Sequence, residues 1–249
     1  MKLRYVTCSD PREHNSIKSI IDLAHLPHAE IAVQCHPSKM SHGMPRNVWF
    51  EQLLHETLQT SRVNLAIHIN NEWSNDICTR GVIPDVILNW ITLTRSYHYP
   101  LIKRIQLNMS KNTADNIKPS AIAKIIHDFP YQEFIFQYND KTQNAIKKLH
   151  KTGAKFSLLF DTSGGNGIQP AQWQKPVYKT HPMGYSGGIS PENVMQNLDK
   201  INKVVGDNEI WIDAEGKLKS LNLFDEKALF DIKLAQAYIR RANLWQKQK

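Results

Sequence analysis

The stretch MGYSGGISPENVMQNLDKINKVV (183–205) joins a short strand-like run to a glycine-rich turn and then to an amphipathic helical pattern. Gly187 and Gly188 permit a tight turn, and the Pro-Glu-Asn triplet at 191–193 is typical of the first turn of a helix. A strand that passes through a short turn into a helix is the repeating unit of parallel α/β folds. The turn has two interpretations: a tight connection, or a cradle in which backbone N–H groups bind an anion.

The same alternation of strand and helix recurs along the whole chain. Strand-like runs occupy residues 2–7, 29–34, 63–69, 103–108, 133–138, 155–160, 183–187 and 209–213, and helical periodicity fills the stretches between them. About eight such units in 249 residues predict a closed (β/α)8 barrel, the TIM barrel, rather than an open doubly wound sheet. No linker or change in composition divides the chain, so we expect residues 1–249 to form a single α/β domain.

Two local expectations concern the segments around the barrel. Residues 36–46, which contain His36 and His42 after the second strand, are expected to form a mobile loop over the barrel mouth. Residues 225–249 carry a long amphipathic pattern and are expected to form a C-terminal helix.

The composition is that of a soluble globular protein, with 41% hydrophobic and 22% charged residues. No apolar run approaches the roughly 18–20 residues of a membrane span, and the N-terminus lacks a secretion signal, so we expect a cytoplasmic protein with no membrane partner. The cysteines form no CxxC pair, which disfavours a disulfide framework and a zinc site. The histidines show no metal-ligand spacing, and we expect neither a metal nor another cofactor.

The net charge of +8 and the pI near 9.3 raise the question of a nucleic-acid partner. The basic residues are spread along helical segments, however, and no zinc-finger, RNP or helix-turn-helix pattern accompanies them. We therefore expect no nucleic-acid partner. A basic field instead favours a small anionic metabolite as the ligand, and we expect the chain to act as a monomer or homodimer.

In a barrel of this kind, the reactive groups lie at the C-terminal ends of the strands. The predicted strands end at Cys8, Gln34, His68, Asn108, Gln137, Asp161, the Gly187–Gly188 pair and Asp213. His68 is a candidate acid or base, because imidazole titrates near neutrality. The candidate substrate-binding residues are Gln34, Asn108, Gln137 and Asp213. For each residue alone, the alternative is a polar side chain that merely ends a strand.

Four stretches, in the same order along the chain, resemble the phosphoribosylanthranilate isomerase family. They are MPRNV (44–48), IQLN (105–108), SLLFDTSGGNGIQPAQW (157–173) and YSGGISPENV (185–194). VTCSD (6–10), FDTSGGNGIQPAQWQKP (160–176) and WIDAEG (211–216) are more similar still to a divergent, uncharacterised branch of these barrels. Both resemblances imply a TIM barrel with its site at the C-terminal end of the strands.

The resemblance to the isomerase implies an Amadori rearrangement, in which a general acid opens a sugar ring and a base removes a proton from the adjacent carbon. It implies that Asp161 is the general acid, that Cys8 is the base, and that Arg46 binds a substrate carboxylate. It also implies phosphate binding by glycines of three loops, namely Gly165, Gly187, Gly188 and Gly216.

The chain departs from the isomerase pattern at two places. Asn108 stands where the family has a histidine, and the last loop reads WIDAEGKLKS (211–220) in place of the family's Asp-Ser-Ser-Gly-Val-Glu. Asp213 and Glu215 in this loop suit a cationic or hydroxylated ligand instead. The function we expect is an isomerase or lyase that acts on a small, phosphorylated sugar-like anion by acid–base chemistry. The alternative is a non-catalytic barrel with a degenerate active site that binds a small molecule or has a regulatory role.

Overall fold

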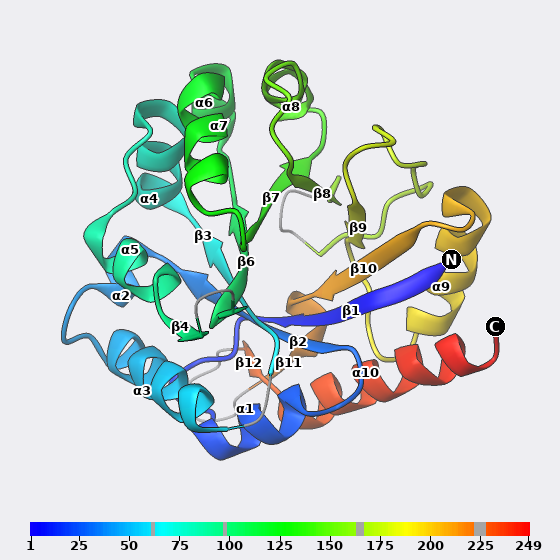
Figure 1. Cartoon of the computed structure of the whole chain (residues 1–249). Helices are drawn as coiled ribbons and strands as arrows, with labels where there is room; N and C mark the ends of the chain where they lie inside the picture. Colours follow the sequence, from blue (N-terminus) through cyan, green and yellow to red (C-terminus); the bar gives the residue numbers. More distant parts are fainter. Residues whose placement is uncertain (61–62, 97–98, 163–166, 222–227) are drawn as a thin grey trace.

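The computed structural model contains a closed barrel of parallel strands wrapped by helices (Figure 1). The structure describes residues 1–60, 63–96, 99–162, 167–221 and 228–249. Around the barrel the strand order is β1-β10-β9-β8-β7-β6-β3-β2, and every neighbouring pair is parallel. The predicted single-domain TIM barrel is therefore confirmed. The barrel strands are β1 (Lys2–Ser9), β2 (Ala29–Cys35), β3 (Leu65–Ile69), β6 (Ile102–Leu107), β7 (Glu133–Tyr138), β8 (Ser157–Phe160), β9 (Met183–Ser186) and β10 (Glu209–Ala214).

Helices follow most of the barrel strands and cover the outside of the barrel (Figure 1). The longer ones are α1 (Ile17–Ala24), α3 (Pro45–Gln59), α5 (Asp85–Ile91), α7 (Pro119–Asp128), α8 (Gln143–His150), α9 (Val194–Val205) and α10 (Ile232–Lys247). The shorter ones are α2 (Pro37–Met40), α4 (Asn71–Asn75), the π-helical turn η1 (Asp76–Arg80), α6 (Lys111–Asp115) and the 3-10 turn η2 (Gly216–Leu218). Between β8 and β9 the described residues form no helix, so this unit lacks the helix that the repeat predicts.

Two small antiparallel sheets lie outside the barrel, β4 (Thr94–Ser96) with β5 (Tyr99–Pro100) and β11 (Lys219–Leu221) with β12 (Ala228–Phe230). The C-terminal helix therefore begins later than the predicted residue 225, and residues 225–227 lie outside the described residues. Asp231 caps α10, because its side chain accepts hydrogen bonds from the N–H groups of Lys233 and Leu234. Residues 36–46, expected to form a loop, contain α2 and the first turn of α3.

Side chains along each barrel strand point alternately into the barrel and out toward the helices. Thr7 and Ser9 of β1 point inward, since their hydroxyls donate to Glu30 at 2.7 Å and to Asp213 at 2.6 Å. Cys8, between them, belongs to the apolar layer that the strands share with the helices. Because of this alternation, only the inward-facing residues of β1 can reach the mouth of the barrel.

The interior of the barrel is packed rather than hollow. Trp211, Ile135 and Leu159 form a buried cluster inside it, and Tyr5 packs against them. Gly184 makes room for the indole, because a Cβ at this position would lie 2.0 Å from Cε2 of Trp211. The packed interior closes the barrel below and leaves its open space at the C-terminal ends of the strands.

Candidate functional site

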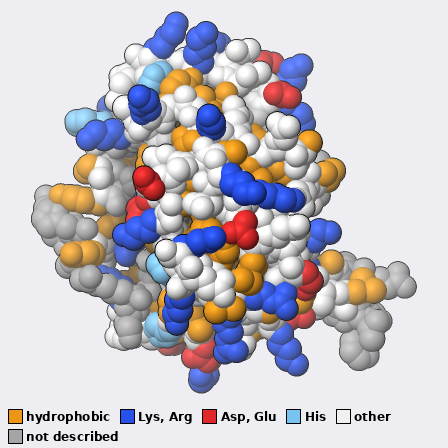
Figure 2. Space-filling view, turned by 90° about the vertical axis from the view of Figure 1, so that its right-hand side faces the viewer, with side chains coloured by type: hydrophobic (Ala, Val, Ile, Leu, Met, Phe, Trp, Pro, Cys, Tyr) orange, Lys and Arg blue, Asp and Glu red, His pale blue; other side chains and the backbone are white. Residues whose placement is uncertain are grey.

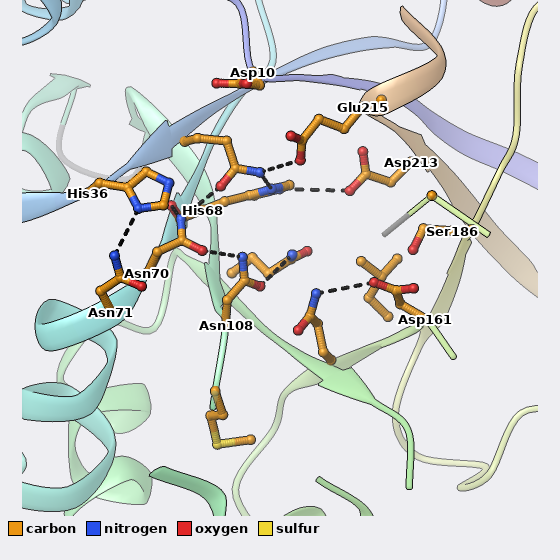
Figure 3. Close-up of a pocket in the computed structure, with 18 of the residues that line it drawn as sticks. Asp10, His36, His68, Asn70, Asn71, Asn108, Asp161, Ser186, Asp213 and Glu215 are labelled. Atoms are coloured by element: carbon orange, nitrogen blue, oxygen red, sulfur yellow. Dashed lines mark hydrogen bonds and ion pairs between the residues drawn. The ribbon is translucent and has the colours of Figure 1, made fainter. Parts of the chain in front are cut away.

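A cavity of about 700 Å³ opens at the C-terminal ends of the barrel strands (Figure 3). This volume is in the range of pockets that enclose small molecules. Side chains from nearly every barrel strand or the loop after it line the cavity, which is mostly polar. Five of the predicted site residues meet here as side chains: Gln34, His68, Asn108, Gln137 and Asp161. Asp213 joins them as a sixth.

Asp213 is a carboxyl group with an unusual environment. It is 7% exposed, and its Oδ1 accepts a 2.6 Å hydrogen bond from the hydroxyl of Ser9. Burial raises the pKa of Asp213 to about 7, and the nearby charges of Glu215 and Asp161 act in the same direction, whereas the Ser9 hydrogen bond opposes them. A carboxyl group with a pKa near neutrality can both donate and accept a proton at physiological pH.

His68 lies beside Asp213 and is neutral. Its Nε2 is 4.0 Å from Oδ2 of Asp213, and burial, assisted by the charge of Arg104, lowers the pKa of His68 to about 3. The Nδ1 atom is 3.3 Å from Nε2 of Gln34. Since that amide nitrogen donates, Nδ1 accepts, and the ring proton resides on Nε2, toward Asp213. His68 can therefore donate a hydrogen bond to Asp213. The prediction that His68 titrates near neutrality is wrong, because its pKa is about 3.

Amide side chains form a hydrogen-bonded chain across one side of the cavity (Figure 3). Gln106 donates to Asn108, Asn108 donates to Asn70, and each bond is 2.8 Å long. Asn70 in turn donates to Gln34 at 2.8 Å, and Gln34 donates to Glu215 at 2.8 Å. The chain fixes the orientation of each amide and connects strands β6, β3 and β2 to the loop after β10. It presents neutral donors and acceptors to a ligand.

Asp161 follows β8, Ser186 ends β9, and Asp213 is the last residue but one of the adjacent strand β10. Ser186 pairs with Asp213 in the sheet register, and in Figure 3 its hydroxyl lies between the two carboxyl groups. Gln137 donates to Oδ2 of Asp161 at 3.4 Å. Ser186 is 9% exposed, and within the described part of the chain its hydroxyl forms no hydrogen bond. A ligand that enters here meets two carboxyl groups and a hydroxyl.

Asp10 closes the cavity on the side of β1 and is held by cations. It adopts a left-handed backbone conformation with φ of 72°, which is uncommon for a residue other than glycine. Arg12 donates to both of its carboxylate oxygens, and Nζ of Lys219 lies 2.8 Å from Oδ2. Burial alone would raise the pKa of Asp10, but these two partners outweigh it and lower the pKa. Asp10 is therefore a structural anion rather than a proton donor.

Three of the glycines predicted to bind phosphate line the cavity. For Gly187 and Gly188, the backbone conformation and close packing account for the need for glycine without a bound phosphate. Gly187 and Gly188 have φ of 115° and 62°, which favours glycine. A Cβ on Gly187 would lie 2.8 Å from the carbonyl oxygen of Ile168, and one on Gly188 would lie 2.8 Å from the backbone nitrogen of Gln169. The glycines thus let residues 167–170 pass close by. Gly216 also lines the cavity, and Gly165 lies outside the described residues.

Two predicted site residues do not reach the cavity. Cys8 is fully buried on the outer side of β1, near Tyr238 of α10, and burial raises the pKa of its thiol well above the usual range. Arg46 lies in α3 and pairs with Glu13 at 3.1 Å and Asp10 at 3.8 Å. The roles of Cys8 as base and of Arg46 as carboxylate ligand are corrected: one points away from the cavity, and the other already holds carboxylates of this chain.

Sequence reasoning missed Ser9, Asp10, Asn70 and Ser186 as site residues, whereas it named Glu215 beside Asp213. A signal for them exists in the chain. Polar residues stand two positions apart at the ends of several strands, as in Thr7-x-Ser9, His68-x-Asn70, Gln106-x-Asn108 and Asp213-x-Glu215. Inward-facing positions of a barrel strand alternate with this period, so each pair marks an inward position near the end of its strand and the position two residues further on, which lies beyond the strand for Asn70, Asn108 and Glu215.

The fold and the cavity define a class, the single-domain TIM barrel with a polar pocket at the C-terminal end of its strands. No protein-family model matches this chain, and no curated protein matches it. Similar solved structures include the Rubisco-like protein from Rhodopseudomonas palustris, with a TM-score of 0.48 and 11% identity over 98% of this chain and 65% of that one. They also include 3-hexulose-6-phosphate synthase from Salmonella typhimurium, with a TM-score of 0.49 and 10% identity over 100% of this chain and 99% of that one.

The chain thus spans about two thirds of the length of that Rubisco-like protein, and likenesses this weak carry no argument about activity. No described helix is long and apolar enough to span a membrane. Among residues 1–60, 63–96, 99–162, 167–221 and 228–249, no three His, Cys, Asp or Glu side chains are grouped so that they could hold a metal ion.

Proposed function

We propose that this barrel is an acid–base enzyme that isomerises a small hydroxylated carbonyl compound. The observation that carries the proposal is Asp213, a buried carboxyl group with a pKa near 7 that lines a cavity together with Asp161. Buried acids with a pKa near the working pH are typical of catalytic sites. The resemblance of the sequence to the phosphoribosylanthranilate isomerase family supports the same reaction class.

Asp213 acts as the general acid and Asp161 as the general base. Asp161 removes the proton from the carbon next to the carbonyl group, while Asp213 protonates the carbonyl oxygen, and an enediol forms. Asp161 then returns its proton to the former carbonyl carbon, and Asp213 recovers a proton from the neighbouring hydroxyl. The steps balance without an oxidant or reductant. This assignment keeps Asp161 in the chemistry, as the sequence predicted, and replaces Cys8 with a group that reaches the cavity.

Ser9 and His68 position the acid. The Ser9 hydroxyl holds one oxygen of Asp213, and the Nε2–H of His68 faces the other at 4.0 Å. Because both groups are neutral, they orient the carboxyl group and leave its proton available for transfer. The cations near Asp10 are bound to other carboxylates and do not lower the pKa of Asp213.

The test is proton exchange at carbon, which needs no knowledge of the natural product. The protein is incubated in D₂O with a panel of sugars, sugar phosphates and other hydroxylated carbonyl compounds, and NMR follows deuterium uptake next to the carbonyl group. We expect exchange with at least one compound, and its loss by about a hundredfold or more in Asp213→Asn and in Asp161→Asn.

Glu209→Gln is the matched control, because Glu209 begins the strand that carries Asp213 and lies at the opposite end of the barrel. This variant should exchange at the wild-type rate, and circular dichroism should show that all three variants are folded. Undiminished exchange in Asp213→Asn would remove the assignment. A compound that binds in the cavity but shows no exchange in the wild type supports the alternative, a non-catalytic binding barrel.

A further inference from the structure

The charge around the cavity differs from that of the molecule as a whole. The chain has a net charge of +8, and Figure 2 shows Lys and Arg side chains scattered over one face. Among the described residues, by contrast, the cavity is lined by the acidic residues Asp10, Glu72, Asp161, Asp213 and Glu215, by the two cations Arg12 and Lys217, and by the histidines His36 and His68. A ligand therefore meets a more acidic surface inside the pocket than outside it.

Two cations at the cavity, Arg12 and Lys219, are already engaged with carboxylates of the chain, whereas Lys217, which also lines it, is exposed. Arg12 binds Asp10 through three contacts, of 2.5, 3.0 and 3.1 Å. Nζ of Lys219 lies 2.8 Å from Asp10 and 2.9 Å from Glu215. A phosphate that recruited either cation would have to replace a carboxylate partner that is already in hydrogen-bonding contact, and its charge would then face the carboxylate it had displaced.

The glycine loop after β9 offers little room for an anion on the side that the two glycines leave open. The carbonyl oxygen of Ile168 lies 2.8 Å from the position of a Cβ on Gly187, and the carbonyl oxygen of Gly167 lies 3.0 Å from that of a Cβ on Gly188. Carbonyl oxygens carry partial negative charge and accept hydrogen bonds. Together with the backbone nitrogen of Gln169, 2.8 Å from the Cβ position on Gly188, they fill this space with the chain itself and leave little room for a phosphate.

The groups that remain suit hydroxyls. The amide chain from Gln106 to Gln34 supplies neutral donors and acceptors, and Ser186 is nine-tenths buried with a hydroxyl that has no partner within the described residues. Carboxylates accept hydrogen bonds from ligand hydroxyls, and amides can both donate to them and accept from them. An arrangement of this kind recognises a polyhydroxylated molecule through directed hydrogen bonds rather than through charge.

We propose that the pocket binds a polyhydroxylated ligand without an anionic group, such as a free sugar, and excludes its phosphate ester. The proposal rests on the proposed use of this cavity as the substrate site, and it replaces the anionic ligand that the sequence predicted. The carboxylates Asp161 and Glu215 reject the ester by like-charge repulsion, while the amide chain and Ser186 select hydroxyl groups.

The experiment compares matched pairs of probes. Isothermal titration calorimetry measures the binding of glucose and ribose, of the phosphate monoester of each, and of inorganic phosphate to the wild-type protein. We expect at least one free sugar to bind, and its monoester to bind about tenfold more weakly or worse, because like charges facing each other in a binding site oppose association. Inorganic phosphate should not compete with the sugar.

Two variants with the same change of net charge locate the effect. Glu215→Gln removes a carboxylate from the cavity and one of the two carboxylate partners of Lys219, so the preference for the free sugar over its ester should shrink. Glu209→Gln, at the other end of β10, should leave the preference unchanged. The proposal is overturned if a monoester binds more tightly than its parent sugar, if no free sugar binds, or if both variants alter the preference equally.

The result is separable from the test of catalysis. If a free sugar binds without deuterium exchange, the proposed ligand class is supported and the proposed catalytic activity is refuted. If exchange occurs and the phosphate ester binds more tightly than the free sugar, the catalytic activity is supported and the proposed ligand class is overturned.

Discussion

The Ser9 hydroxyl donates a 2.6 Å hydrogen bond to Oδ1 of Asp213, and this bond links the C-terminal ends of β1 and β10 where the barrel closes. Ser9 is the inward-facing neighbour of Cys8, which packs outward near α10. A single step along the strand therefore separates a residue that adjusts the acid from one that only fills the core. Substituting Ser9 and Cys8 in turn therefore compares the loss of a contact to the acid with the loss of core packing alone.

Ser9→Ala should shift the pH profile of exchange rather than abolish exchange. The hydrogen bond from Ser9 lowers the pKa of Asp213, so its removal raises that pKa further. Because Asp213 acts as the acid in its protonated form, the alkaline limit of activity should move to higher pH, by about one unit. The measurement is the rate of deuterium exchange as a function of pH, with Ser9→Thr expected to restore the wild-type profile.

Cys8→Ala is the control for this comparison. It should lower the free energy of unfolding by about 1 kcal/mol, comparable with the loss of one buried methylene group, and leave the pH profile unchanged. Urea denaturation and the same exchange assay check both parts. A loss of exchange in Cys8→Ala with an intact fold would restore Cys8 as the base.

Asp213 should make the protein less stable as the pH rises toward neutrality. Its folded-state pKa of about 7 is above the ordinary value of 3.8, so its contribution to stability is fully present below pH 3.8 and is lost as the pH rises to about 7. The loss is on the order of 4 kcal/mol. Asp213→Asn removes this group, and the difference in unfolding free energy between variant and wild type should therefore grow in favour of the variant over that interval.

Chemical denaturation at a series of pH values measures this difference, and Glu209→Gln serves as the control because Glu209 is largely exposed. Parallel curves for the wild type and Asp213→Asn between these two pKa values would show that Asp213 ionises normally in the folded protein.

The sequence predicted the barrel well because strand and helix periodicity are local properties. The apolar runs at 29–34 and 133–138 coincide closely with β2 and β7. The C-terminal helix was predicted too early, since Ala228, Leu229 and Phe230 are apolar residues that fit a helix pattern as well as a strand. Their pairing with residues 219–221 in β11 is a contact between separate segments that a local pattern does not contain.

The candidate site was predicted in part, and its two main errors have separate physical origins. Strands buried on both faces read as continuous apolar runs, so the pattern does not say which of two neighbours points inward. The resemblance to the isomerase family placed the base on Cys8, and the pattern alone could not show that Ser9, not Cys8, faces inward. Arg46 was misplaced for a different reason, because its partner Glu13 comes from the loop before α1 and only the folded chain brings the two together.

Arg104 and Glu30 form a buried ion pair below the cavity, with Nη1 2.6 Å from Oε1. Burial raises the pKa of Glu30, and the charge of Arg104 opposes that rise. Arg104→Met would leave Glu30 buried without this cation and should cost about 3–5 kcal/mol of stability. Since a protonated Glu30 no longer needs the cation, the cost should be smaller on the acidic side of neutrality, as urea denaturation can measure.

Arg104→Met combined with Glu30→Gln tests the cause of that loss. The double variant has no buried charge at these two positions, so it should be more stable than Arg104→Met alone at neutral pH. A double variant that is less stable by the sum of both single effects would mean that the lost contacts of the Arg104 side chain, which stacks on Trp211 at 4.2 Å, explain the cost instead.

Gly184→Ala should destabilise the barrel through overpacking, because its Cβ would lie 2.0 Å from Cε2 of Trp211. The expected cost is about 1–3 kcal/mol, measured by denaturation. Gly216→Ala is the matched control, since no atom lies within 4 Å of its added Cβ, and it should change stability by less than about 0.5 kcal/mol. Trp211→Ala removes the indole, so Gly184→Ala should cost less in that background than in the wild type. Equal costs in both backgrounds would show that the glycine is required for another reason than the packing of Trp211.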